Sequence, residues 1–291
     1  MRYAVNPLQL YAGTDGLLDF AAGPPPNIAE GAAERAGFRA IQANLDIADP
    51  AAYRKRLASC GLAPAPGYFH AVFDQPVFDA EDVGARFRNA LTASRALGLS
   101  DIVVACAVTP AGRAQAGRAQ DRPLDDLAVD RVADRVSDLG RSATATGVRL
   151  CFHQHVGTAI ESPAELEALL AWTDPDAVQL CQDTGHLVWG GVNDLAGFLT
   201  SHFGRTAMLH IKDLDRAVLG EARAARLDYG ATVRAGLWRE PGWGDLDLSA
   251  VLEPWRDVPL WAVVEVDRPS LPDAAASLAA SHDFTLNREA T

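Results

Sequence analysis

Short apolar segments recur along the chain and alternate with longer stretches in which apolar residues repeat every three to four positions. The first pattern predicts buried strands and the second predicts amphipathic helices. The predicted strands cover residues 3–7, 40–43, 63–68, 101–105, 148–152, 177–181, 207–211 and 260–266. The predicted helices cover residues 27–36, 52–60, 82–97, 123–145, 163–172, 194–203, 248–255 and 272–281. Eight strand and helix units in 291 residues are typical of an α/β protein with a single (β/α)₈ (TIM) barrel.

Several of these helices carry signals for their first and last residues. Ser162 precedes a proline and is followed three positions later by Glu165, which predicts a helix N-cap with a capping box. Glycines stand between a predicted helix and the next strand at four places, where a left-handed C-cap is expected. They are Gly37, Gly61, Gly98 and Gly147.

The chain lacks a linker rich in proline, glycine or serine, so we expect one domain over residues 1–291. A doubly wound sheet is the rival architecture, but Gly13, Gly16 and Gly23 are too widely spaced for its phosphate-binding turn. His210 and Glu265 are 55 residues apart, which predicts an insertion at about 214–240, after strand seven. Its many arginines favour a solvent-exposed helical decoration on the catalytic side of the barrel.

Charge and hydropathy exclude several classes of protein. The chain has 26 lysines and arginines against 38 acidic residues, a formal net charge of −12, so nucleic acid is not an expected partner. Its apolar segments are far shorter than the roughly 18 residues of a membrane helix, and the N-terminus lacks the apolar core of a secretory signal. We therefore expect a cytoplasmic protein whose four cysteines are reduced.

Side chains that bind metal ions follow four of the predicted strands. They are His153, Asp183, His210 and Glu265. Asp183 lies 30 residues after His153 and 27 before His210, about one strand and helix unit each, which places these side chains on one rim of a barrel. Imidazoles and carboxylates together suit Mn²⁺, Co²⁺, Fe²⁺, Zn²⁺ or Mg²⁺. Glu265 also stands inside an otherwise apolar strand, where a charge must be paired or coordinated.

The motifs around these residues resemble the xylose isomerase-like sugar isomerase/epimerase superfamily, and within it the inosose dehydratases most closely. The motifs are His153-x-His155-x-Gly157-Thr158, Asp183-Thr184-Gly185-His186, His210-x-Lys212-Asp213, Pro241-Gly242-x-Gly244-x-x-Asp247 and Val264-Glu265. The resemblance covers most of the chain and is specific in its C-terminal half.

This resemblance implies a barrel with a divalent ion, most often Mn²⁺ or Co²⁺, that binds the oxygens of a keto-sugar or cyclitol. Asp183, His210 and Glu265 match the ligand positions of the family. The strand-five position differs, because epimerases of this group have a glutamate where this chain has His153. Glu161, eight residues later, is an alternative ligand from the following loop.

Proton removal next to a ketone needs a base and an electrophile on the developing enolate oxygen. Glu265 is the candidate base, and His155, His186 or Lys212 is the candidate for protonating a leaving hydroxyl. Two of these have alternative roles: His186 can orient Asp183, and Lys212 can pair with Asp213 or with Asp183. The candidate substrate-binding residues are His70, Trp189 and Trp243, although both tryptophans are also compatible with simple packing.

Four functions remain to be compared. The first is a metal-dependent lyase or isomerase acting on a keto-sugar, keto-glycoside or inosose. A two-base epimerase needs a second base, and a metal-dependent endonuclease of the same superfamily needs a basic groove, against which the net charge argues. A non-catalytic sugar-binding subunit that kept the barrel is the fourth. Barrel enzymes of this kind are often homo-oligomers, but the sequence identifies no interface.

Overall fold

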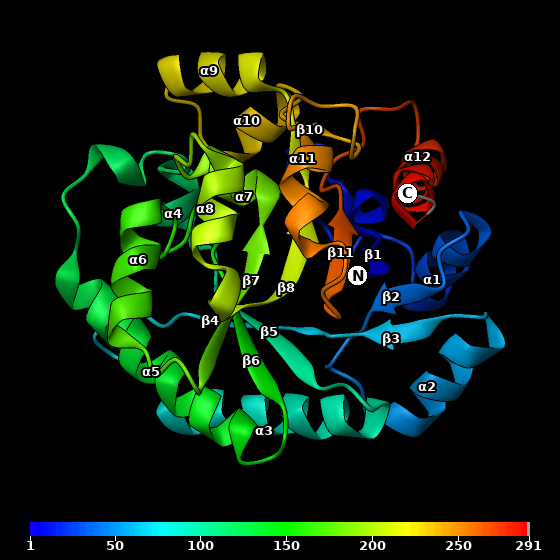
Figure 1. Cartoon of the computed structure of the whole chain (residues 1–291), viewed down its shortest axis with the longest axis horizontal. Coiled ribbons are helices and arrows are strands. Elements are labelled where there is room, and N and C mark those ends of the chain that lie inside the picture. The colour runs from blue at the N-terminus through cyan, green and yellow to red at the C-terminus, as the bar shows by residue number, and fades with distance from the viewer. Residues whose placement is uncertain (290–291) are drawn as a thin grey trace.

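The main sheet of the computed structural model, which describes residues 1–289, consists of nine strands that all pair in parallel (Figure 1). The strands are β1 (Arg2–Asn6), β2 (Ala40–Gln42), β3 (Ala63–Ala65), β4 (Tyr68–Ala71), β5 (Asp101–Cys106), β6 (Arg149–His153), β7 (Val178–Asp183), β8 (Thr206–Ile211) and β11 (Trp261–Glu265). Their order is β3-β2-β1-β11-β8-β7-β6-β5-β4. The expected domain over 1–291 includes two residues, 290 and 291, that lie outside the described part.

The two ends of this sheet meet at Pro66 and Gly67. The expected strand at 63–68 is in fact two strands, because proline has no N–H for a ladder and the chain bends there. β3 pairs with β2, whereas β4 pairs with β5. Gly67 bridges the gap: its carbonyl accepts a 2.9 Å hydrogen bond from the Val103 N–H. The sheet therefore closes, and the predicted (β/α)₈ barrel is confirmed.

Helices cover the outside of the barrel. Those that the apolar periodicity predicts are α1 (Pro26–Arg35), α2 (Pro50–Ser59), α3 (Ala80–Leu97), α5 (Asp126–Thr144), α6 (Pro163–Trp172), α8 (Leu195–Ser201), α11 (Leu248–Leu252) and α12 (Ala274–Glu289). Several bounds differ from expectation by one to three residues, and the end of α12 differs by eight. α5 begins after Asp125, whose carboxylate caps it by accepting the Ala128 N–H, and α12 runs beyond 281 because no glycine or proline interrupts it. α12 packs against α1, so the last described helix lies beside the first helix of the chain (Figure 1).

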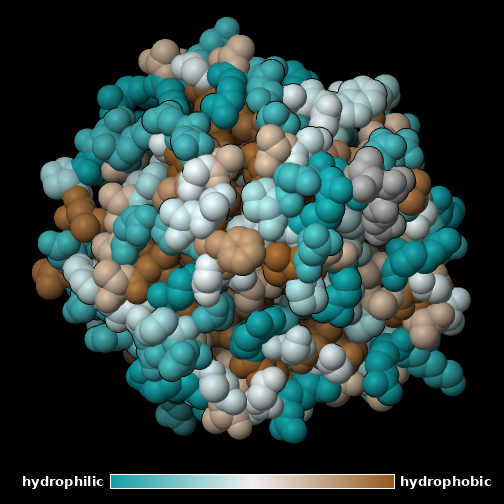
Figure 2. Space-filling model, viewed as in Figure 1, coloured by the Kyte–Doolittle hydropathy of each residue, from teal (hydrophilic) through white to brown (hydrophobic). Residues whose placement is uncertain are grey.

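The strands alternate between two apolar layers. Side chains that point into the barrel form a small cluster that includes Ala4, Val103, Cys151, Cys181 and Val263. Their sequence neighbours point outward and join the larger core between the sheet and the helices. On the face shown in Figure 2, hydrophilic residues cover most of the periphery and hydrophobic residues appear between them. The narrow inner layer leaves the C-terminal ends of the strands free for polar side chains.

Further elements lie at the C-terminal end of the barrel, and of these only the helices of the insertion at about 214–240 were expected. They are α4 (Pro110–Ala114), α7 (Thr184–Trp189), β9 (Asp213–Leu214), α9 (Arg216–Ala224), α10 (Tyr229–Arg234) and β10 (Trp238–Arg239). β9 and β10 form an antiparallel pair, and α9 and α10 lie above the end of β7 (Figure 1). The interpretation of this insertion as a solvent-exposed decoration is wrong for Tyr229 and Trp238, which are buried. The many arginines of the insertion made the apolar face that packs on the barrel hard to recognise from the sequence.

The helix ends follow the sequence signals. The Ser162 hydroxyl accepts the Glu165 N–H, and the Glu165 carboxylate accepts the Ser162 N–H at 2.8 Å, so the capping box is confirmed. The four glycines expected as C-caps all have positive φ, between 70° at Gly61 and 107° at Gly37. Within residues 1–289, no helix combines the length and apolar character needed to cross a membrane.

We expect Ser162→Ala to lower the free energy of unfolding by about 1 kcal/mol, because it leaves N–H groups at the start of α6 without their acceptor. Urea denaturation followed by circular dichroism measures this change. Thr200→Ala, at an exposed site on α8, is the control and should stay within about 0.5 kcal/mol of the parent. Equal stability of the two variants would show that the capping box contributes nothing.

Candidate active site

Three strand ends place a carboxylate, an imidazole and a second carboxylate next to one another inside the barrel. Asp183 ends β7 and lies opposite His210 of β8, and Glu265 ends the adjacent β11. One potential ligand atom from each of the three lies within 4.8 Å of the other two. The exposed fractions are 1% for Asp183, 0% for His210 and 4% for Glu265. The structure thus brings these three candidate ligands together as a buried group at the C-terminal ends of their strands.

The unused lone pairs of this group fit a metal ion. Oδ1 of Asp183 accepts the His186 N–H at 2.7 Å, but Oδ2 is buried without a hydrogen-bond partner, and Nδ1 of His210 lies 3.4 Å from Oε2 of Glu265. Buried polar atoms nearly always have a partner, so such atoms need an explanation. Burial raises the pKa of Asp183 to about 7 in the ion-free protein. A divalent ion held by Asp183, His210 and Glu265 would satisfy these atoms and keep the carboxylate ionised.

Two amides that the sequence analysis missed hold the other side of the group. Asn6, at the end of β1, donates to Oε1 of Glu265 at 2.8 Å and to Oε1 of Gln42 at 2.7 Å. The amide nitrogen of Gln42, at the end of β2, lies 3.2 Å from Nε2 of His210. Both residues lie one position before the end of a predicted strand, so a search of all the strand ends for polar side chains could have found them.

Lys212 has different partners from those expected. Its ammonium bonds to Asp267 and lies 3.3 Å from Oε2 of Glu265, so pairing with Asp213 is wrong. Asp213 instead accepts backbone N–H groups, among them those of Gly242 at 2.9 Å and Gly244 at 3.1 Å, and so shapes the 240–246 loop. Burial by itself would lower the pKa of Lys212, but Asp267 and Glu265 outweigh it and raise that pKa. Lys212 is therefore a permanent buried cation.

Tyr229 extends the polar network of Lys212, Asp267 and Glu265 into the insertion. Its hydroxyl donates to Oδ2 of Asp267 at 3.1 Å, and burial, with Asp267 next, raises its pKa well above the usual range. Three buried carboxylates, Asp183, Glu265 and Asp267, thus face one buried ammonium, a formal balance of −3 + 1 = −2. One divalent cation neutralises this charge.

Three histidines line the pocket beside Lys212. His186 Nε2 lies 3.4 Å from the Lys212 nitrogen, and the ring centroids of His155 and His186 are 3.8 Å apart. Burial, followed by Lys212, lowers the pKa of His155 to about 4, and burial also lowers those of His153 and His186. All three imidazoles are therefore neutral at pH 7. The part of His186 that contacts Asp183 is its backbone N–H rather than its ring.

The candidate substrate-binding residues occupy different environments. Trp189 is buried and lies parallel to the His186 ring, with centroids 6.3 Å apart, and it also contacts Tyr229 and Trp238. It forms part of the wall of the pocket. His70 of β4 is exposed beside Tyr68, and Trp243 is 61% exposed on the loop shaped by Asp213. Contact of His70 or Trp243 with a substrate stays a prediction.

Glu161, the alternative ligand, does not join the candidate ligands. Its carboxylate accepts the Ala119 N–H at 2.9 Å and the Gly157 N–H at 2.7 Å, which ties together the loops after β5 and β6. The expectation that Glu161 completes the metal site is therefore wrong. A buried carboxylate between two loops has the same sequence signature as a ligand, and only its partners distinguish them.

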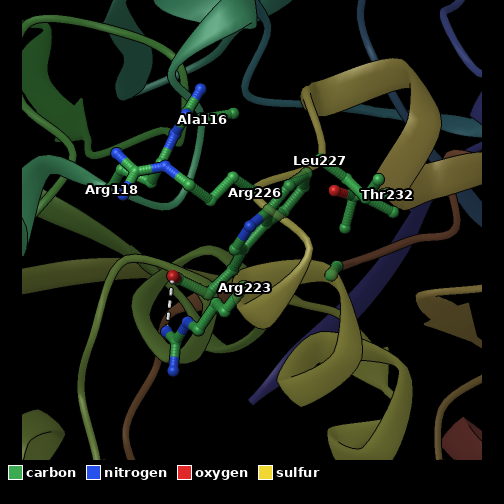
Figure 3. Close-up of a pocket in the computed structure, with 8 residues that line it drawn as sticks. Ala116, Arg118, Arg223, Arg226, Leu227 and Thr232 are labelled. Atoms are coloured by element: carbon green, nitrogen blue, oxygen red, sulfur yellow. Dashed lines mark hydrogen bonds between the residues drawn. The ribbon is translucent and has the colours of Figure 1, made fainter.

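A small pocket opens beside the site, where the insertion meets the loop after β5 (Figure 3). It is lined by Ala116, Arg118, Trp189, Ala222, Arg223, Arg226, Leu227 and Thr232. Arg223 donates to the carbonyl oxygen of Trp189 at 2.8 Å, the bond drawn as a dashed line in Figure 3. Trp189 therefore separates this pocket from the histidines, and Arg223 fixes the insertion to α7.

A closed parallel barrel with buried acids and imidazoles at the C-terminal ends of its strands defines the class of (β/α)₈ barrels with a polar site at that end. A family model described as xylose isomerase-like TIM barrel matches residues 31–287, and the chain belongs to this family.

Curated relatives of the chain include several inosose dehydratases. The chain is 30% identical over 206 residues to inosose dehydratase of Geobacillus thermodenitrificans, a match that covers 69% of this chain and 67% of that protein. It is 32% identical over 152 residues to the enzyme of Lactiplantibacillus plantarum. That second match spans 51% of this chain and half the length of the relative.

Solved structures share the fold at low sequence identity. The IolI protein with a bound zinc atom superposes with a TM-score of 0.70 at 14% identity, covering 99% of this chain and 98% of that one. The 3-keto-D-glucoside 4-epimerase YcjR of E. coli also gives 0.70, at 17% identity and 99% coverage of both chains. These matches establish the barrel fold.

We expect Asp183→Asn to abolish stabilisation by Mn²⁺, because the amide removes a charged ligand while keeping the side-chain shape. A ligand present at 100 times its Kd stabilises a protein by about 2.7 kcal/mol, so the loss is easily measured by thermal unfolding with and without the ion. Asp176→Asn, at an exposed aspartate, is the matched control and should respond to Mn²⁺ as the parent does. An unchanged response in Asp183→Asn would reject the assignment of this ligand.

Proposed function

We propose that this protein is a divalent-metal-dependent lyase that dehydrates an inosose or a related keto-sugar by removing the proton next to the carbonyl. The observation that carries this proposal is the buried group of Asp183, His210 and Glu265 beside the permanently charged Lys212. The similarity to inosose dehydratases over two thirds of one relative supports the substrate class. Mn²⁺ is the ion that we expect, since the group offers two carboxylates and one imidazole.

A bound divalent ion would supply Lewis acidity toward the carbonyl oxygen of the substrate, which makes the neighbouring C–H acidic. Asp183, His210 and Glu265 are the residues that would hold it. Glu265 is also the base: His210 and Lys212 outweigh the effect of burial and hold its pKa well below the usual range, so it is ionised before it accepts a proton. Asn6 holds its other oxygen and fixes its orientation.

The proton that Glu265 accepts must leave again with the hydroxyl, because elimination releases water. Lys212 lies 3.3 Å from Glu265 and 3.4 Å from Nε2 of His186, so its ammonium links the base to the imidazoles. His186 in turn lies against His155. Lys212 and His186 are therefore the residues that would pass a proton from Glu265 toward the leaving hydroxyl.

The strand-five residue favours elimination over two-base epimerisation. An epimerase needs a proton acceptor on each face of the carbon that it inverts. Here β6 ends in His153, and the carboxylates of Asp183, Glu265 and Asp267 come from β7 and from β11 and the residues that follow it. A single base with a proton path to a leaving hydroxyl is the arrangement that dehydration requires.

Glu265→Gln should slow both exchange of the substrate's α-proton in D₂O and release of the dehydrated product by about 10²–10⁴-fold, since loss of a positioned base typically costs this much. The assay uses an inosose at saturating Mn²⁺, with ion occupancy measured, because Glu265 is also a ligand. Nuclear magnetic resonance follows the exchange, and mass spectrometry follows a product lighter by one water. A fully loaded variant that exchanges the proton at the parent rate would place the base elsewhere. An epimer in place of the dehydrated product would instead favour the two-base reaction.

Tyr229→Phe should lower kcat about 10- to 100-fold with little change in KM, because a hydrogen bond to a charged group contributes about 1.5–3 kcal/mol. The change frees Asp267 to draw Lys212 away from Glu265 without removing any group that touches the substrate. Tyr53→Phe is the control, since it also removes a buried tyrosine hydroxyl, whose hydrogen bond, from the N–H of Asn44, involves none of the residues of the proposed site. A rise in KM alone would assign Tyr229 to substrate binding instead.

A further inference from the structure

His153 occupies the strand-five position of the expected metal site, but it does not group with the two carboxylates. Among the described residues, one ring nitrogen of His153, one of His210 and Sγ of Cys181 lie within 4.8 Å of one another. Cys181 precedes Asp183 by two residues on β7, so both side chains point into the barrel and Cys181 lies one layer deeper, about 7 Å along the strand. A second set of donors therefore lies below the first and shares His210 with it.

The two sets differ in the ions that they favour. Asp183, His210 and Glu265 offer mainly oxygen, which suits Mn²⁺ or Mg²⁺. Two imidazoles and a thiolate form a softer set, typical of Zn²⁺ and of its spectroscopic substitute Co²⁺. The chemistry of the deeper donors thus points to a thiophilic ion.

A further observation indicates a cation at the deeper position. Nδ1 of His153 is buried without a hydrogen-bond partner, although buried polar atoms are nearly always paired. Oε2 of Glu265 lies 3.4 Å from Nδ1 of His210, so a carboxylate faces the imidazole that the two positions share. Hydrophobic packing by itself does not explain the unpaired nitrogen of His153.

We propose that His153, Cys181 and His210 form an inner, thiolate-containing ion position that takes Zn²⁺ or another thiophilic divalent ion. The proposal deepens the proposed function, because it names the residues that decide which ion enters the same barrel. On binding, sulfur exchanges its proton for a bond to the ion, and the proton leaves to solvent. The shared His210 makes the two positions competitive, so a thiophilic ion at the inner position displaces Mn²⁺ from the outer one.

A third group of donors, His153, His155 and His186, is less suited to a cation. The ammonium of Lys212 lies 3.4 Å from Nε2 of His186, so an ion there would face a positive charge at close range. The group that contains Cys181 instead has the carboxylates of Asp183 and Glu265 nearby. Because of this difference in local charge, we choose the group that contains Cys181 as the ion position.

Co²⁺ binding tests the proposal, because a cobalt–thiolate bond gives a charge-transfer band in the near ultraviolet that oxygen and nitrogen ligands do not give. The full-length protein, stripped of metal, is titrated with Co²⁺ alone and then with Zn²⁺ against bound Mn²⁺. We expect the band in the parent and its loss in Cys181→Ser and Cys181→Ala. We also expect the Zn²⁺ affinity of both variants to fall at least about tenfold.

Cys151→Ser is the matched control, since Cys151 is equally buried in the same inner layer but belongs to none of the donor groups. It should keep the band, and all variants should keep the parent's Mn²⁺ affinity, which depends on Asp183. Absence of the charge-transfer band in the parent, or its persistence in the Cys181 variants, overturns the proposal of an inner ion position. Neither result touches the proposed function, which fails separately if Asp183→Asn still responds to Mn²⁺.

Discussion

The ion pair between Lys212 and Asp267 is the interaction on which the site depends. Lys212 is the ammonium that compensates three buried carboxylates at the C-terminal end of the barrel, and each unpaired charge in such a place costs several kcal/mol. Asp267 and Glu265 share this one cation, and Asp183 contributes the excess negative charge. The remaining formal charge of −2 is the charge that one divalent ion would neutralise.

This arrangement requires the insertion after β8. Tyr229 and Trp238 come from that segment, and they close the pocket over His186 and Trp189. Exclusion of water strengthens the interaction of Lys212 with its carboxylates, because the effective dielectric constant falls. Arg216 of α9 is exposed, whereas Leu219 and Ala222 of the same helix are buried. The insertion therefore contributes to the candidate active site, where the hydroxyl of Tyr229 contacts Asp267, the partner of Lys212.

His153 and Cys181 are the residues on which both proposals about the site depend. Under the proposed function, a histidine at the end of β6 leaves a single base, which favours elimination, and the same histidine brings a ring nitrogen next to the thiol of Cys181. One residue of the inner layer would thus bear on both the reaction and the choice of ion, because few inward positions remain at the ends of β6 and β7.

The sequence by itself determined the barrel, since the spacing of apolar segments and helix caps such as Ser162 is a local property that each segment carries. It also identified Asp183, His210 and Glu265 as neighbours, because parallel strands end on one rim. Only the tertiary structure decided their partners. Lys212 pairs with Asp267 rather than with the adjacent Asp213, and Glu161 binds loop N–H groups, because side-chain partners depend on direction and burial, which sequence separation does not encode. The covering role of Tyr229 was invisible for the same reason: its contacts are made across 38 residues or more of chain.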